Sequence, residues 1–165
     1  MIRSPQRQLA PDTVGPGIDE TISVRGIADK ARHDKVHRFG NLYGELNEVL
    51  LKEAWRRLNK SAASGIDRVT ARDYGRELDA NIKDLVERLK SKRYRAKAVR
   101  RHYIPKGDGK QRPLGIQVVE DKLLQAGVAM LLEAIYETDF LPVSFGYRPG
   151  VGARDAVQAL GFNLQ

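Results

Sequence analysis

A glycine-rich turn in the middle of the chain constrains the fold more than any other feature of the sequence. The segment Lys106–Lys110 reads Lys-Gly-Asp-Gly-Lys and lies between two short extended segments, 99–105 and 111–116. Asp-Gly pairs are typical of tight connections between antiparallel strands, because glycine adopts the backbone angles that such turns need. Pro105 and Pro113 favour edge or terminal strand positions. The pattern predicts a β-hairpin with lysines at its tip.

Helices are expected on both sides of this hairpin. Apolar residues recur every three or four positions in the segments 43–58, 71–90 and 119–137. Thr70, with an acidic residue three positions later, predicts a capping box at the start of the second helix. A last helix is expected to begin near residue 153.

The positive charge of the chain is concentrated in one window. The 165 residues include 29 Lys and Arg and 21 Asp and Glu, for a net charge of +8. Residues 87–112, here called the basic strip, contain eleven basic and two acidic side chains, or +9. An ordinary solvated surface mixes both signs more evenly, and clustered cations are typical of polyanion binding. We therefore interpret the strip as a nucleic-acid-binding surface, the alternative being a cationic face without a partner. Its candidate binding residues are Arg93, Arg95, Arg100, Arg101 and Lys110.

Several classes of protein are excluded or disfavoured by what the sequence lacks. The absence of cysteine excludes disulfides, thiol catalysis and iron–sulfur clusters. Neither a P-loop motif nor a dinucleotide-binding glycine motif occurs. His33 and His37 are four positions apart, but no third ligand is apparent, so no metal site is predicted. No segment has the length and apolar character of a membrane span or a signal peptide, which predicts a cytoplasmic protein without a membrane partner.

The chain is expected to have two parts. Residues 1–40 are rich in Pro, Gly, Asp and Arg and lack a sustained apolar period, which predicts a disordered or loosely held extension. Residues 41–165 contain the predicted helices and hairpin. The last helix ends at Gln165 without a capping residue, which suggests a truncated domain.

Three segments carry a resemblance to a known family. They are SGIDRVT at 64–70, IPKGDGKQRPLGI at 104–116 and SFGYRPGVGARDA at 144–156. In this order and with this spacing they resemble the N-terminal part of group II intron reverse transcriptase/maturases, over about residues 36–160. Each segment alone is a weak signal, whereas the three together are specific.

The resemblance implies a fold, a function and partners. The implied fold is α+β, with helix-rich fingers and a small antiparallel hairpin, as an incomplete part of a right-hand polymerase. Residues 41–165 would form the fingers and a partial palm. The implied function is that of the N-terminal part of an RNA-directed DNA polymerase. Its implied partners are intron RNA or an RNA template, a deoxynucleotide triphosphate and the missing C-terminal part of the polymerase.

The resemblance also implies roles for single residues. The family residues that correspond to Lys106 and Arg112 contact the triphosphate of the incoming nucleotide. The chemistry agrees, because arginine offers a fork to two phosphate oxygens and lysine offers a point charge. Tyr147 and Arg148 correspond to a loop near the template, so we expect both on the template side. Asp67 belongs to a loop whose expected role is architectural rather than catalytic.

Catalysis is not expected from this chain alone. The family's paired carboxylates hold two Mg²⁺ ions and lie C-terminal to the matched region. The sequence has no Asp-Asp pair, and Glu120 and Asp121 stand at a helix start, where capping and the helix dipole account for them. We therefore expect no catalytic residue and no bound metal here, with Mg²⁺ serving the complete family enzyme only. The alternative function is a non-catalytic basic RNA-binding module or a relic of a mobile element.

Overall fold

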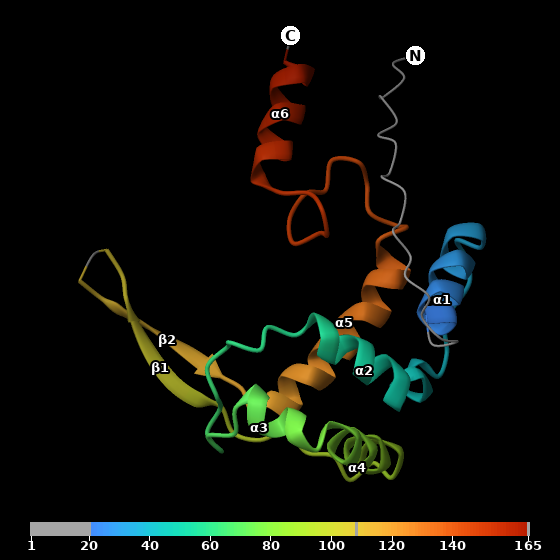
Figure 1. Cartoon of the computed structure of the whole chain (residues 1–165). Helices are drawn as coiled ribbons and strands as arrows, with labels where there is room; N and C mark the ends of the chain where they lie inside the picture. Colours follow the sequence, from blue (N-terminus) through green and yellow to red (C-terminus); the bar gives the residue numbers. More distant parts are fainter. Residues whose placement is uncertain (1–20, 108, 165) are drawn as a thin grey trace.

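The structure, a computed structural model, describes residues 21–107 and 109–164 (Figure 1). The elements in chain order are α1 (Thr21–His33), the 3₁₀ helix η1 (Leu42–Glu45), α2 (Glu48–Arg57), α3 (Ala71–Arg76), α4 (Leu78–Lys90), β1 (Arg100–Pro105), β2 (Gln111–Ile116), α5 (Val119–Tyr136) and α6 (Ala153–Asn163). Helices and one small antiparallel sheet confirm the expected α+β class. The assembly of a right-hand polymerase remains a prediction.

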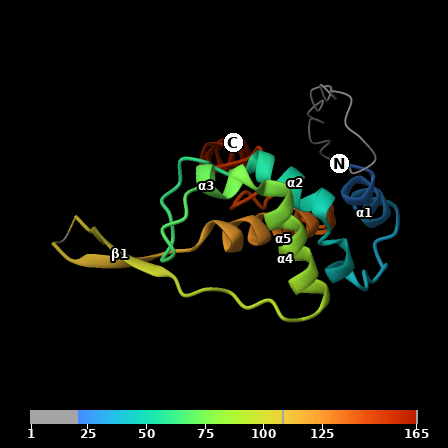
Figure 2. The same ribbon diagram turned by 60° about the horizontal axis from the view of Figure 1, so that its bottom comes forward.

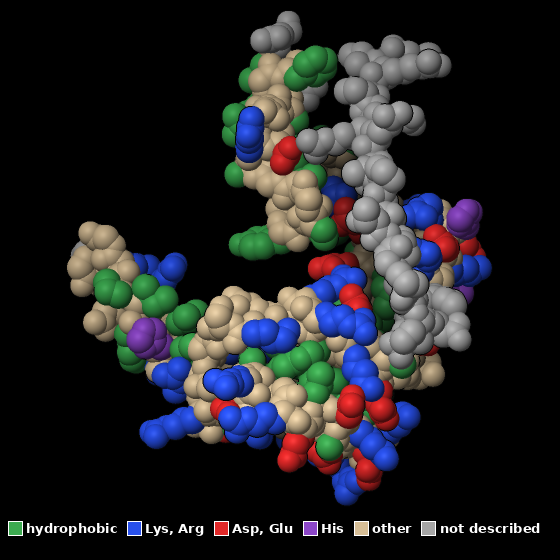
Figure 3. Space-filling model, in the orientation of Figure 1, with side chains coloured by type: hydrophobic (Ala, Val, Ile, Leu, Met, Phe, Trp, Pro, Cys, Tyr) green, Lys and Arg blue, Asp and Glu red, His purple; other side chains and the backbone are tan. Residues whose placement is uncertain are grey.

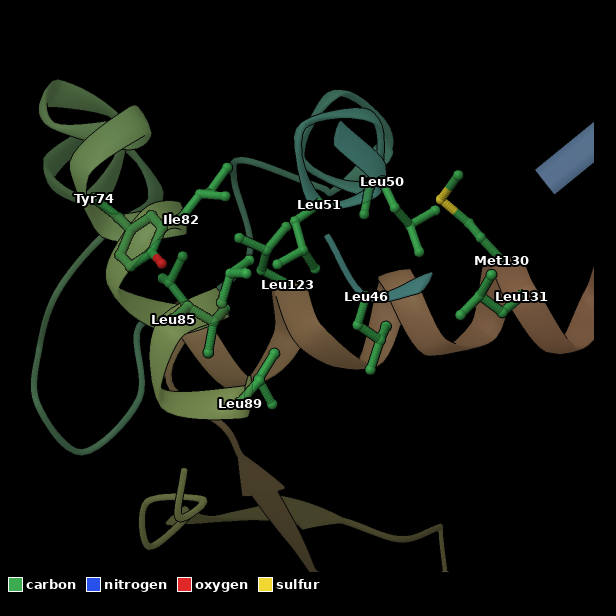
Figure 4. Packing of buried hydrophobic residues seen from close by; sticks show 13 residues of the cluster. Leu46, Leu50, Leu51, Tyr74, Ile82, Leu85, Leu89, Leu123, Met130 and Leu131 are labelled. Atoms are coloured by element: carbon green, nitrogen blue, oxygen red, sulfur yellow. The ribbon is translucent and has the colours of Figure 1, made fainter. Parts of the chain in front are cut away.

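The core forms where α2 packs against α5 and α4, with side chains from all three helices in one buried cluster (Figure 4). Leu51, Ile82 and Leu123, one from each of these helices, are completely buried. Each such side chain stabilises the fold by about 1.5–3 kcal/mol relative to exposure. Gly127 on α5 lets α2 come close, because a Cβ at this position would lie 3.0 Å from Leu51 Cδ2. Close helix packing therefore explains a glycine in the middle of the longest helix.

The first described helix, α1, differs from the expectation for residues 1–40. Ala31 is buried, and Val24 and Ile27 pack against the core beside α5. The expected loose extension therefore does not hold for residues 21–33, whereas residues 1–20 lie outside the described residues. A short apolar pattern within a Pro- and Gly-rich window was sufficient to form a docked helix.

The helix expected at 43–58 has a later start than its periodicity predicted. Residues 42–45 form the 3₁₀ helix η1, and α2 begins after Asn47. The side chain of Asn47 accepts a hydrogen bond from the backbone N–H of Leu50 at 2.9 Å. Such a cap satisfies one of the free N–H groups of the first helical turn, which sets the helix start.

The helix expected at 71–90 is divided into α3 and α4 at Glu77. Its predicted capping box is confirmed, with Thr70 Oγ1 accepting from the backbone N–H of Asp73. At the break, Asn81 Nδ2 donates to the carbonyl of Tyr74 at 2.9 Å. This bond satisfies a carbonyl that the interruption of the helix leaves without its usual partner.

The predicted hairpin is confirmed and projects from the body of helices (Figures 1 and 2). The strands pair from Arg100 opposite Ile116 to Pro105 opposite Gln111. Beyond them, the N–H of Lys106 donates to the carbonyl of Lys110 at 2.6 Å. Gly109 has a φ of 76°, a left-handed conformation that glycine adopts without strain. The turn therefore depends on a glycine that can be recognised in the sequence.

The segment after α5 exposes much apolar surface. In Figure 1, α6 stands apart from the core helices. Large apolar side chains that are exposed in this segment are Phe140, Leu141, Val143, Tyr147, Val157, Leu160, Phe162 and Leu164. None of the helices in the described ranges is long and apolar enough to span a membrane.

Candidate nucleic-acid interface

The basic strip is held to the core by a buried carboxylate. Residues 91–99 run from the end of α4 past α5 to β1 (Figure 2). Asp121 on α5 is only 3% exposed, and it accepts hydrogen bonds from the Tyr94 hydroxyl and from the backbone N–H of Lys97, the latter at 3.0 Å. Burial and the bond to Asp121 raise the pKa of Tyr94, so its phenol remains a donor. The path of the strip is therefore determined by α5.

A second carboxylate of α5, that of Glu120, binds Arg88, the first basic residue of the strip. Arg88 donates to both oxygens of Glu120, at 3.1 and 2.6 Å, and to Asp84 at 2.7 Å. The hydrogen bonds with Glu120 raise the pKa of Arg88 further above its usual value. The capping part of the interpretation of Glu120 and Asp121 is therefore wrong, because these carboxylates bind groups of the strip and α5 begins without a side-chain cap. Both lie in the first turn of α5, where the helix dipole favours acidic residues, as expected.

The base of the hairpin rests on the loop 64–70. Arg100 donates to the carbonyl of Ser64 through Nε at 3.1 Å and Nη2 at 2.8 Å. Lys122 on α5 donates to the neighbouring carbonyl of Ala63 at 2.5 Å. Arg100, a candidate RNA contact in the sequence, thus uses its guanidinium to attach the hairpin to this loop.

The two candidate triphosphate-binding residues lie on the same face of the hairpin. Arg112 is directly opposite Ile104, and Lys106 is opposite Lys110. Opposite residues of an antiparallel pair point to one face, and diagonal neighbours are about 7–8 Å apart, within reach of long side chains. Lys106 and Arg112 are diagonal neighbours and both are exposed. One phosphate chain can therefore contact both side chains.

The other candidate cations of the strip differ in their surroundings. Arg101 is exposed, and by its register lies on the opposite face of the hairpin from Arg112. Arg93 is exposed, with a hydrogen bond to Ser91 at 2.9 Å and an ion pair with Glu87 at 3.5 Å. Figure 3 shows Lys and Arg side chains spread over the lower part of the molecule and beside the projecting hairpin. The exposed cations offer a surface for a polyanion.

The two candidate template-side residues are separated from the hairpin by the length of α5. The hairpin leads into the N-terminal end of α5, and the loop with Tyr147 and Arg148 follows its C-terminal end. Arg148 donates to Glu137 at 2.5 Å and to the carbonyl of Ser144 at 2.7 Å, and its guanidinium lies over the ring of Phe140. Arg148 therefore closes its own loop, whereas the side chain of Tyr147 is fully exposed.

The carboxylates at the start of α5 are engaged by other residues of the protein. Within residues 21–107 and 109–164, no group of three or more His, Asp or Glu side chains is arranged to hold a metal ion. Glu120 and Asp121 are bound to Arg88 and Tyr94. His33 contacts the carbonyl of Asp29 at 2.7 Å.

The chain is similar to several curated proteins, although no protein-family model matches it. It is 35% identical over 100 residues to Protein YkfC of Escherichia coli K12, covering 61% of this chain and 26% of that protein. It is 40% identical over 104 residues to the group II intron-encoded protein LtrA of Lactococcus lactis subsp. cremoris, covering 62% of this chain and 17% of LtrA. A 91 kDa protein in the cob intron of Schizosaccharomyces pombe is 37% identical over 84 residues, 51% of this chain and 10% of that protein.

These similarities bear on the family resemblance and on how much of each relative the chain represents. Relatives that are encoded by introns confirm the family resemblance that the three sequence segments indicated. The chain spans about a quarter or less of the length of the curated relatives that it matches.

Proposed function

We propose that this chain, which is similar to group II intron-encoded proteins, forms the part of an RNA-directed DNA polymerase that holds RNA and the incoming nucleotide. The observation that carries the proposal is the shared hairpin face of Lys106 and Arg112, next to an exposed cationic surface. The intron-encoded relatives support intron RNA as the polyanion. Deoxynucleoside triphosphate is the proposed ligand of the hairpin.

In the proposed function, Mg²⁺ would be bound by residues other than the described ones. In a complete polymerase the metal ions activate the primer hydroxyl and bridge the phosphates. Because Glu120 and Asp121 already bind the strip, we assign no step of DNA synthesis to the described residues. Their proposed work is to position RNA and triphosphate.

RNA binding is tested by reversing charge at exposed residues of the strip. The double variant Arg93→Glu/Arg101→Glu should weaken binding to RNA of any sequence, because it removes cations that neutralise phosphates. The slope of log affinity against log salt should fall by about 0.7 for each phosphate of a single strand that is no longer neutralised. Fluorescence anisotropy with a labelled single-stranded RNA, over a salt series, measures both quantities.

The matched control changes the same charge elsewhere. Arg72 and Lys83 are exposed and lie on α3 and α4, outside the basic strip. Arg72→Glu/Lys83→Glu should retain most of the affinity and the original salt slope. Equal losses in both double variants would mean that net charge alone, and not the strip, attracts RNA. Arg100 is unsuitable for this test because its guanidinium holds the Ser64 carbonyl.

Triphosphate binding is tested on the hairpin face. Arg112→Ala and Lys106→Ala should each weaken deoxynucleoside triphosphate binding by about ten- to a hundredfold, the effect of removing a charge-assisted hydrogen bond of about 1.5–3 kcal/mol. Arg112→Lys should restore little, because lysine lacks the guanidinium fork. Displacement of a fluorescent triphosphate analogue measures the affinity.

Gln111 provides the control, since it is exposed on the opposite face of the same strand. Gln111→Ala should bind triphosphate as the parent chain does. If the Lys106 and Arg112 variants bind triphosphate normally while RNA binding persists, the chain is instead a non-catalytic RNA-binding module.

A further inference from the structure

A pocket of about 500 Å³ opens beside the basic strip, between η1, the end of α4 and the middle of α5. It is lined by Tyr43, Leu46, Leu89, Lys92, Tyr94, Arg95, Leu124 and Val128. Its volume lies in the range of small-molecule sites, roughly 300–1,000 Å³. No sequence motif marks this pocket, because its residues come from segments that are distant in the chain.

The floor of the pocket is apolar and belongs to the core. Leu46 and Leu89 are 7% and 3% exposed, and Figure 4 shows both beside α5. Leu124 and Val128 on α5 are partly buried and pack against the core cluster. The floor is thus anchored by residues that the fold already holds in place.

Two tyrosine rings line the pocket, each fixed through its hydroxyl. Tyr43 donates to the carbonyl of Leu89 at 2.7 Å, and Tyr94 donates to Asp121. Tyr43 is 49% exposed, so a large part of its side chain is accessible. Because their hydroxyls are held in place, both rings provide ordered surfaces at little further entropic cost.

Cations from the basic strip stand at the rim. Lys92 and Arg95 are exposed, and both line the pocket. The hydrogen bonds of Arg95 to the carbonyls of Tyr94 and Lys92, at 2.8 and 3.3 Å, use Nη1, one of three guanidinium nitrogens. An apolar, aromatic cavity with a cationic rim complements a flat ring that is attached to an anion.

We propose that this pocket holds one unpaired base of the bound RNA, with Lys92 and Arg95 on the adjoining phosphates. The proposal rests on the RNA binding proposed above and names the form of RNA that is recognised. Bases in a duplex are stacked and paired, whereas those of loops and single strands can be inserted between aromatic side chains. Charge complementarity also selects a nucleotide over an uncharged aromatic ligand.

The test compares two labelled strands of equal length and charge, an oligouridylate and an abasic oligoribose phosphate. The parent chain should bind the strand with bases on the order of tenfold more tightly, as expected for one base on an aromatic surface. Val128→Phe fills the pocket and should remove this preference while leaving the affinity for the abasic strand unchanged. Gln125→Phe, which adds the same ring at an exposed position of α5, should retain the preference.

A second variant and a cross-link protect the test against a folding defect in Val128→Phe. Tyr43→Leu removes one ring at a half-exposed position and should also abolish the preference for bases. Thiouridine in the oligouridylate should cross-link on irradiation to the peptides that contain Tyr43 or Tyr94. Mass spectrometry identifies the cross-linked peptides.

The outcomes separate this proposal from the proposed function. If the parent chain binds both strands equally, the pocket does not take a base, although RNA binding stands. If the preference survives both pocket variants, or cross-links map only to the hairpin, a base is bound elsewhere and the proposal is overturned. If neither strand binds, the proposed RNA-binding function fails together with it.

Discussion

Replacing Gly65 with alanine is expected to destabilise this protein more than a substitution of one hydrogen by a methyl group usually does. A Cβ at Gly65 would lie 2.6 Å from both the N and the Cα of Val118 and 2.8 Å from the carbonyl carbon of Gln117. These are backbone atoms at the start of α5, so no side chain can rotate away. The constraint is space, because the φ of Gly65 lies outside the left-handed region.

The expected cost of Gly65→Ala is about 1–3 kcal/mol or more, the range for overpacked positions in a close-packed structure. Against a total stability of roughly 5–15 kcal/mol, this is a large fraction. Urea unfolding followed by circular dichroism and by the fluorescence of Trp55 measures the midpoint. RNA affinity should fall as well, because a displaced Ser64 carbonyl releases Arg100 at the base of the hairpin.

Gly107→Ala is the matched control for this prediction. A Cβ at Gly107 would meet nothing within 4 Å, and its φ is not left-handed. The free energy of unfolding should therefore stay within about 0.5 kcal/mol of the parent protein, as for most surface substitutions. If both variants unfold at the same urea concentration, the contact between the loop 64–70 and α5 does not constrain the fold.

Replacing Asp121 with alanine is expected to have the second large effect. The Tyr94 hydroxyl and the backbone N–H of Lys97 would both be left without their acceptor. A buried polar group without a partner costs about 1–3 kcal/mol, so a destabilisation of about 2–6 kcal/mol is expected for the pair. The strip between α4 and β1 should loosen, and the Lys97 amide should no longer be protected from hydrogen exchange.

A double-mutant cycle with Tyr94→Phe isolates the side-chain part of this effect. Tyr94→Phe alone should cost about 1 kcal/mol, but little in the Asp121→Ala background, because the hydroxyl no longer has its acceptor there. Asp79→Ala is the control, since Asp79 is 83% exposed and pairs with Lys52 on the surface. Such pairs contribute about 0–1 kcal/mol. Additive effects of the Asp121 and Tyr94 substitutions would contradict the assigned hydrogen bond.

The elements that the sequence predicted well are those specified by neighbouring residues. The hairpin follows from glycine at 107 and 109, and the start of α3 follows from the Thr70 capping box. The helix 119–137 was predicted to within one residue of α5, because its apolar period is long and uninterrupted. The break at Glu77 escaped prediction, since the apolar period continues across it while the tertiary structure redirects the chain.

The same distinction between local and tertiary information applies to the candidate site. The excess of positive charge at 87–112 and the common face of Lys106 and Arg112 follow from composition and from strand register, which are local. The sequence does not show which arginines are available to a ligand. Arg88, Arg100 and Arg148 each satisfy acceptors of the protein itself.

The sequence alone determined the hairpin, the main helices and the basic strip, because turn chemistry, helical period and charge depend on residues a few positions apart. It also carried the family resemblance, in three short segments. Only the tertiary structure decided how the strip is held and where its pocket lies. Asp121 and Tyr94 are 27 positions apart, and Glu120 and Arg88 are 32 apart. Their pairing exists because α2 packs against both α4 and α5, so that all three helices share one core and the start of α5 lies near the end of α4.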